Sequence, residues 1–235
     1  MSVSFKHLLA AGLLAMPFCV LAAGTATIQG QDGSRFTLEY DGSQLRLESS
    51  RHRNVHLIAN GDSVYAVTTA AGQPLVVSGG AVMSLLSAQG GQKFATGSED
   101  IRSFTSLTST GRYETVAGIR GAIHQLKYVD RGGRQRTEEI VLSEHPEVAQ
   151  MTRSFGRAAA AFQQGAGVDN EGSRALLREL ENRNLGLLRF ANHYQVVALQ
   201  TTAPSPARFQ LPAAPMQLPG LQGLGSLIPG LGGAR

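Results

Sequence analysis

The sequence predicts an α+β protein in which a curved antiparallel sheet of about ten strands forms a half-barrel, with helices packed in its concave face. Three observations lead to this prediction. Apolar and polar residues alternate with a period of two in much of the chain before residue 143. Pairs such as Asp41-Gly42 and Asn60-Gly61, which favour tight hairpins, separate several of these segments. Apolar residues then recur at helical spacing between residues 146 and 182.

The expected strands can be placed from these alternations. They run over residues 25–29, 34–40, 44–49, 55–59, 63–68, 74–77, 103–107, 113–116, 122–129, 135–142, 187–190 and 195–199. On residues 34–40, the side chains of Phe36, Leu38 and Tyr40 point one way and the polar residues between them point the other. Leu45 and Leu47 alternate in the same manner on the next strand. These five apolar side chains are expected to face the helices.

Two longer helices and one short one are expected. The short helix covers residues 81–88. Pro146 suits the first position of a long helix, because its missing N–H needs no partner there. Met151, Phe155 and Phe162 then share one apolar stripe of that helix. A second helix begins at Ser173, which is a favourable N-cap.

The first 22 residues have the order of a signal peptide. Lys6 precedes an apolar run that is too short to span a bilayer, and small residues lie just before Ala23. We therefore expect cleavage before Ala23 and a periplasmic mature protein. Its folded domain is expected to cover residues 23–203, with a helical insertion at residues 146–182.

Cysteine usage and charge limit the classes of function. The only cysteine, Cys19, lies in the leader after Phe18 rather than after a small residue, so we expect neither a lipid anchor nor a disulfide. Without the leader, 20 basic residues face 17 acidic ones, a net charge of +3. The two signs are interleaved along most of the chain, which argues against a nucleic-acid partner.

The C-terminal segment, residues 204–235, differs in composition from the rest. It holds six of the nine prolines and carries no charge between Arg208 and Arg235. Leucines recur in it every three or four residues, among glycines and prolines that disfavour a helix. We expect a disordered tail. Docking of this tail on an envelope protein or a membrane, and insertion of the tail as a plug against the sheet, are the alternatives.

The chain lacks the sequence motifs of nucleophilic, metal-dependent and nucleotide-binding enzymes, so we expect no catalytic residues, no metal and no cofactor. His52 and His56 would share a strand face, but no carboxylate lies near them to complete a metal site. Glu144, His145 and Glu147 cluster where a helix begins, and acidic groups there favour the helix dipole.

Three arginines, Arg131, Arg134 and Arg136, crowd the tip of one expected hairpin. A solvated turn is the simpler interpretation of this cluster. Contact with an anionic headgroup is the alternative, because guanidinium groups bind phosphates and carboxylates with paired hydrogen bonds.

Four stretches of the chain, taken in order, resemble a known family. They are Gln-Leu-Arg-Leu-Glu at residues 44–48 with an outward Arg46, the strand pair at residues 113–127, Leu-Gly-Leu-Leu-Arg at residues 185–189, and Phe-Gln-Leu-Pro at residues 209–212. The family is the periplasmic lipoprotein-carrier-like superfamily, and the resemblance is to an uncharacterised branch of it. This resemblance implies a half-barrel covered by helices that binds a lipid or a lipidated protein.

We therefore expect a periplasmic binding or carrier module for an apolar ligand. The residues expected to contact the ligand are Phe36, Leu38, Tyr40, Leu45, Leu47, Met151, Phe155 and Phe162. The chain has no Trp, so aliphatic side chains must form most of any cavity wall. The alternative is a non-enzymatic protein-interaction or sensor domain with a filled core, acting through its tail. Under either interpretation, we expect no transmembrane segment after signal cleavage.

Overall fold

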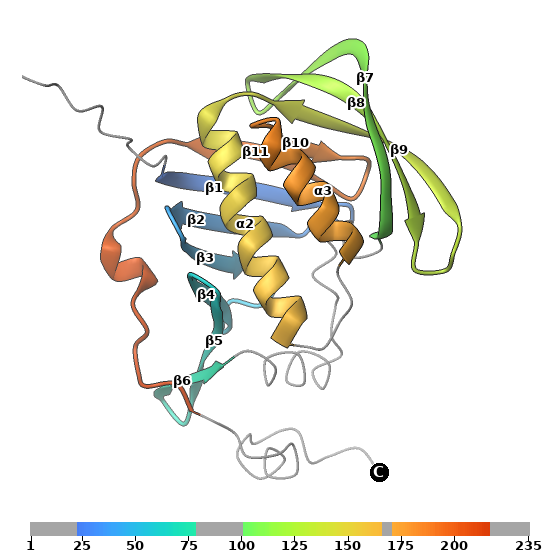
Figure 1. Ribbon diagram of the computed structural model, residues 1–235. Coiled ribbons are helices and arrows are strands. Elements are labelled where there is room, and N and C mark those ends of the chain that lie inside the picture. The colour runs from blue at the N-terminus through green and yellow to red at the C-terminus, as the bar shows by residue number, and fades with distance from the viewer. Residues whose placement is uncertain (1–22, 79–100, 166–170, 217–235) are drawn as a thin grey trace, which may run out of the picture.

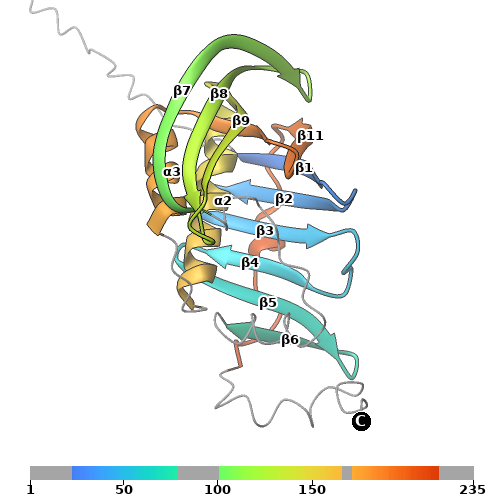
Figure 2. The ribbon, with the colours of Figure 1, turned by 90° about the vertical axis from the view of Figure 1, so that its right-hand side faces the viewer.

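The computed structural model describes residues 23–78, 101–165 and 171–216. Within these residues, eleven strands form one antiparallel sheet in the order β6-β5-β4-β3-β2-β1-β11-β10-β9-β8-β7. The sheet is curved and does not close on itself, and two helices lie on one side of it (Figures 1 and 2). The predicted α+β class and half-barrel-like sheet are therefore confirmed. The expected leader and the short helix at residues 81–88 lie outside the described residues.

The sheet consists of two meanders that meet in its middle. The first contains β1 (Ala23–Gly30), β2 (Arg35–Asp41), β3 (Gln44–Ser49), β4 (His56–Asn60), β5 (Ser63–Ala70) and β6 (Gln73–Ser78). The second contains β7 (Ile101–Val116), β8 (Ile119–Asp130), β9 (Gln135–Ser143), β10 (Gly186–Phe190) and β11 (Tyr194–Gln200). Pairing of β1 with β11 joins them, so the first strand lies beside the last.

One predicted break in the sheet is wrong. Residues 103–107 and 113–116 were expected as separate strands, yet both belong to the single 16-residue strand β7. Gly111, with a φ of +73°, allows an irregularity between Ser109 and Tyr113, and pairing with β8 continues on both sides of it. A bulge of this kind bends a strand without ending it.

The helices α2 (Pro146–Gly165) and α3 (Glu171–Asn182) connect β9 to β10. Leu38 pairs with Leu47, and Tyr40 with Leu45, across β2 and β3. These four side chains are buried in one hydrophobic cluster that also contains Val148 and Met151 of α2. We call this side of the sheet the helix face and the opposite side the outer face. A second cluster joins α3 to β7, β8, β9 and β10.

The segment after β11 packs on the outer face. A short 3₁₀ helix, η2 (Pro206–Phe209), lies against β3 and β4, and the Phe209 side chain is only 1% exposed. Leu211 and Ala213 then pack on an outer-face cluster of Ile58, Val67 and Val76. The segment, which Figure 1 shows in orange-red, runs from β11 to the sheet edge at β6, where the Met216 N–H donates to Val76 O at 2.8 Å.

The folded part of the chain therefore extends beyond residue 203, where the sequence placed the end of the domain. The expectation of disorder does not hold for residues 204–216, and residues 217–235 lie outside the described residues. Proline and glycine do keep the segment from forming a long regular element. Its apolar side chains are nevertheless fixed, because they cover apolar surface on the outer face that would otherwise meet water.

The opposite orientation of neighbouring side chains on β2 can be tested by substitution. Leu38 is fully buried, and Leu38→Asp is expected to lower the free energy of unfolding by more than about 4 kcal/mol, because it buries an unpaired charge. Thr37 points to the outer face, so Thr37→Asp is expected to cost only about 1 kcal/mol. Urea denaturation followed by circular dichroism measures both. Equal losses would show that the two faces are assigned wrongly.

The contribution of the outer-face segment to the fold can be tested at Phe209. Phe209→Ala is expected to lower the free energy of unfolding by about 3 kcal/mol, because it removes a fully buried aromatic ring. Its exposed neighbour offers a control, and Gln210→Ala is expected to change stability by less than about 0.5 kcal/mol. Thermal denaturation of the mature chain compares the two. An unchanged melting temperature for Phe209→Ala would mean that the segment is not part of the fold.

Candidate functional site

A cavity of about 80 Å³ lies between the two helices and the helix face of the sheet. The helices contribute Met151, Thr152, Phe155, Gly156, Ala159, Ser173, Leu176, Leu177 and Leu180 to its wall. The strands contribute Ile28, Gly30, Phe36, Leu38, Leu47, Leu187, Phe190 and Tyr194. The wall is almost entirely apolar, so the cavity is suited to an aliphatic group.

The structure brings together most, but not all, of the residues expected to contact a ligand. Phe36, Leu38, Leu47, Met151 and Phe155 line the cavity. Three others do not line it. Tyr40 and Leu45 belong to the hydrophobic cluster of the helix face, and Phe162 packs against that cluster.

The position of Tyr40 explains why it lies outside the cavity. Its hydroxyl donates to the backbone oxygen of Glu147 at 3.1 Å, which fixes the ring beside the first turn of α2. Burial, followed by the charge of Glu147, raises the pKa of Tyr40 to about 12, so the phenol remains a neutral donor at physiological pH. Tyr40 therefore anchors the helix to the sheet.

Sequence reasoning missed the part of the cavity wall that comes from the last two strands. Leu187, Phe190 and Tyr194 lie on β10 and β11, and they reach the cavity because β11 pairs with β1. The Phe190 and Tyr194 rings stack with centroids 6.2 Å apart. Alternation identified these strands but could not show which strands they would pair with, because pairing between distant segments leaves no local pattern.

Small residues keep the cavity open. Gly30, Gly156, Ala159 and Ser173 line it, and none of them has a side chain that could fill the space. Gly156 also lets the helices approach closely, since a Cβ atom there would lie 2.8 Å from Cδ2 of Leu177.

Two of the polar lining side chains, those of Thr152 and Tyr194, bring no charge into the cavity. The Thr152 hydroxyl donates to Val148 O at 2.9 Å and accepts from the Leu187 N–H at 2.8 Å. Burial raises the pKa of Tyr194, which keeps its phenol neutral. A bound group would therefore be held by apolar contact and shape rather than by ionic recognition inside the cavity.

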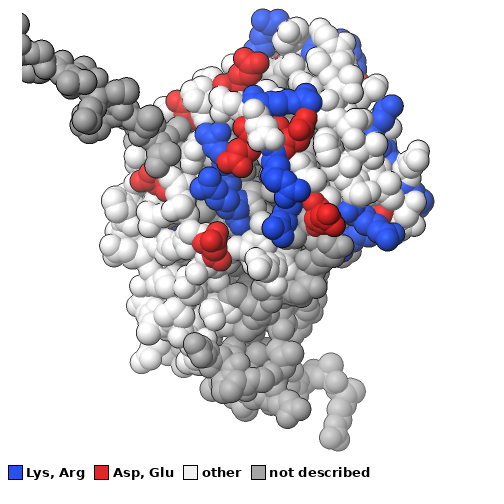
Figure 3. Space-filling model, viewed as in Figure 1, with Lys and Arg blue, Asp and Glu red and all other residues white. Residues whose placement is uncertain are grey.

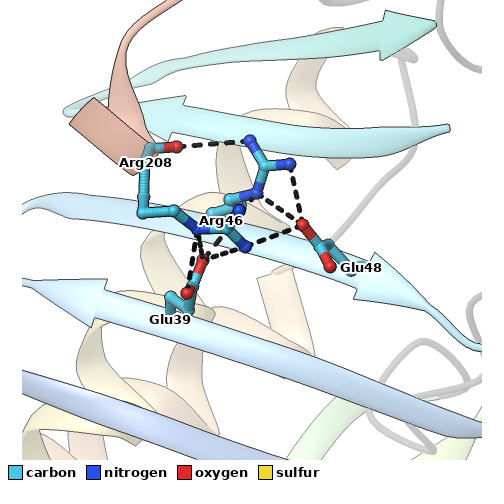
Figure 4. A network of polar contacts seen from close by, with 4 residues as sticks. All are labelled: Glu39, Arg46, Glu48 and Arg208. Atoms are coloured by element: carbon cyan, nitrogen blue, oxygen red, sulfur yellow. Dashed lines mark hydrogen bonds and ion pairs between the residues drawn. The ribbon is translucent and has the colours of Figure 1, made fainter. Parts of the chain in front are cut away.

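A network of four charged side chains holds η2 on the outer face (Figure 4). The Arg208 Nε donates to both carboxylate oxygens of Glu39, at 3.0 and 2.9 Å, and its Nη2 donates to Glu48 Oε1 at 2.9 Å. Arg46 donates to the same Glu48 oxygen at 2.7 Å and to Arg208 O at 3.3 Å. Arg46, the outward residue of the stretch at residues 44–48, is thus part of a clamp on the C-terminal segment.

The clamp changes the titration of its neighbours. Burial opposes ionisation of Glu48, but the hydrogen bonds and charges of Arg46 and Arg208 outweigh it and lower the pKa of this carboxyl. His56 lies directly opposite Glu48 on β4. Burial and then the charge of Arg46 lower the pKa of His56 to about 4, so the imidazole is neutral at physiological pH.

The other polar clusters found in the sequence form contacts within the protein. Arg134 and Arg136 bond to Asp130, with Nε atoms 3.2 and 2.9 Å from its Oδ2. A backbone hydrogen bond from Arg134 and the side-chain bond from Arg136 lower the pKa of Asp130 to about 2. His145 Nδ1 lies 2.6 Å from Glu147 Oε2 at the start of α2. These contacts favour a structural interpretation of both clusters.

In the described part of the chain, no three His, Cys, Asp or Glu side chains are grouped in a way that could hold a metal ion. None of the helices within the described ranges is long and apolar enough to cross a membrane.

Nothing among protein-family models, curated proteins or solved structures matches this chain. The resemblance to an uncharacterised branch of the lipoprotein-carrier-like superfamily therefore rests on the sequence stretches alone, and the cavity is interpreted from its own residues.

The environment of His56 predicts a dependence of stability on pH. In the unfolded chain His56 has the ordinary pKa of 6.5, whereas in the folded chain its pKa is about 4. Between these values the unfolded state binds the extra proton, so the free energy of unfolding falls as the pH is lowered. Allowing for solvent screening, we expect a loss of about 1 kcal/mol between pH 7 and pH 5.

Urea denaturation at the two pH values measures this loss, and His56→Gln is expected to remove it. The matched control is His52→Gln in the exposed loop before β4, which keeps the dependence of the natural chain. A dependence that survives in His56→Gln would assign the titration to another group.

Proposed function

We propose that this chain is a non-enzymatic binding module of the cell envelope that holds an apolar ligand, the acyl chain of a lipid or of a lipidated protein. The observation that carries the proposal is the apolar cavity between the helices and the sheet, whose polar lining residue Thr152 is already hydrogen-bonded within the protein. Each methylene group moved there from water contributes roughly 0.8 kcal/mol.

We also infer that the helices occupy the concave face of the half-barrel. Contacts of α2 extend from β10 across β1, β2 and β3 to β5, while α3 contacts β7. A helix that reaches strands so far apart in the sheet order crosses the hollow of a curved sheet rather than one margin of it. This arrangement supports a site enclosed on one side by strands and on the other by helices.

The size of the cavity limits what enters without movement. An engineered cavity of about 150 Å³ lined by aliphatic residues admits benzene, and this cavity has about half that volume. It suits the end of an acyl chain. A longer chain requires α2 and α3 to separate, and their anchorage on different strands supports such movement, because α3 packs on β7 whereas α2 packs on β10 and on strands of the first meander.

The proposed location is the periplasm. Its support is the order of charge, apolar run and small residues before Ala23. The stretches that resemble the lipoprotein-carrier-like superfamily, in particular an uncharacterised branch, are consistent with that location and with an acyl ligand.

The second candidate function is a protein-interaction or sensor domain. Its support is the position of the outer-face segment, which ends with Met216 bonded at the edge strand β6. The uncharged leucine-rich sequence follows Met216 directly in the chain. If the cavity binds nothing, this interpretation takes precedence.

Filling the cavity tests the proposal. 1-N-phenylnaphthylamine, a neutral apolar dye, is expected to gain fluorescence on binding to the mature chain. Ala159 lines the cavity, and Ala159→Leu is expected to weaken binding about tenfold by occupying the space. The control, Ala175→Leu, changes a half-buried residue of α3 outside the cavity wall.

A dye signal that is absent, or equal for the two variants, would contradict the proposal, provided that circular dichroism shows both variants to be folded. Mass spectrometry of organic extracts from protein purified from its native envelope then identifies the natural ligand class.

A further inference from the structure

A second hollow lies between the two helices, next to the cavity. It is an open groove of about 270 Å³. Its margins carry Arg153 and Arg157 from α2 and Arg174, Arg178 and Glu181 from α3. Leu177, Leu180 and Leu185 form its apolar floor. The groove therefore combines a basic margin with an apolar base.

The positive charge of this groove is only partly neutralised. Arg153 donates to Gln150 Oε1 and Asn184 Oδ1, which are neutral acceptors. Arg157 lies 3.7 Å from Glu181 Oε1, the one carboxylate of the lining.

Arg174 and Arg178 are exposed and form no ion pair with any described residue. Four guanidinium groups thus face one carboxylate, a net charge of +3. Figure 3 shows basic side chains gathered over the two helices, with acidic ones among them.

The groove and the cavity share part of their walls. Both are lined by Thr152, Gly156, Leu177 and Leu180. Gly156 has no side chain, and the half-buried Leu177 packs directly on it. Rotation of the Leu177 side chain would therefore join the two spaces, and the chain has no bulky residue at Gly156 to keep them apart.

We propose that the ligand is an anionic amphiphile, whose carboxylate or phosphate lies between the arginines of the groove while its apolar chain passes Leu177 into the cavity. This inference rests on the proposed function, since it specifies the ligand of the same site. Arginine is suited to the task, because its planar guanidinium group forms paired hydrogen bonds with either anion. The groove supplies the charge recognition that the cavity lacks.

The experiment compares two fluorescent probes that differ only in their head. One is cis-parinaric acid, a fatty acid with a free carboxylate, and the other is its neutral methyl ester. Each is titrated into the natural mature chain and into a double variant, Arg174→Gln with Arg178→Gln. Neither arginine has an ion pair to lose, and Gln suits a helix, so the variant keeps its fold.

The matched control is Arg53→Gln with Lys127→Gln, which removes the same charge from exposed positions outside the groove. The double variant is expected to bind the acid about tenfold more weakly than the natural chain does, because two partly screened charges are lost. Its affinity for the ester is expected to be unchanged, and the control variant is expected to bind both probes like the natural chain.

Three results overturn the inference and leave the apolar cavity in place. The first is that the groove variant binds the acid as tightly as the natural chain does. The second is that the groove and control variants lose affinity for the acid equally. The third is that inorganic phosphate binds as tightly as the acid, which would indicate a site for small anions alone. Failure of the natural chain to bind either probe is a different outcome, because it contradicts the proposed function itself.

Discussion

Pairing of the first strand with the last is the constraint on which the rest of the structure depends. The β1–β11 ladder joins two meanders that would otherwise be separate sheets with no shared floor for α2. It also places the side chains of Phe190 and Tyr194 beside those of Ile28 and Phe36, so one cavity wall combines residues from opposite ends of the domain. Closing a loop of this length costs conformational entropy, which the contacts on both sides of the ladder must offset.

The sequence predicted what is local and missed what is distant. Alternation on β2 and β3 identified the buried face of the sheet. Side chains on a strand point alternately to its two faces, so the face that carries Leu38 and Leu47 is the one that must be buried. Sequence reasoning divided β7 in two, because the alternation is interrupted between residues 107 and 113 and only pairing with β8 shows the interruption to be a bulge. It also treated Phe209 as part of a tail, because burial of that ring depends on a surface made by β3 and β4, far away in the chain.

The two faces of the sheet hold their coverings by different forces. On the helix face, α2 and α3 pack through apolar side chains, and the Tyr40 hydroxyl bond marks where α2 begins. On the outer face, ionic contacts between Arg208 and two carboxylates position η2, while burial of Phe209 supplies the apolar contact. Directional bonds suit a short segment with little apolar surface, since they fix its register where packing alone would leave it free to slide.

The helix pair combines close packing with two features that lower stability, an unfilled cavity and arginines without ion pairs. Close packing at Gly156 and Leu177 stabilises the pair, yet the small residues of the helices leave a cavity between the pair and the sheet. Unfilled volume costs stability, because its lining atoms lose contacts that a tightly packed core would provide. Unpaired arginines at the same place add repulsion that acidic neighbours could have removed. A helix pair selected for stability alone would fill the cavity and pair the arginines with carboxylates. The proposed ligand would do both, with its apolar chain in the cavity and its anionic head among the arginines.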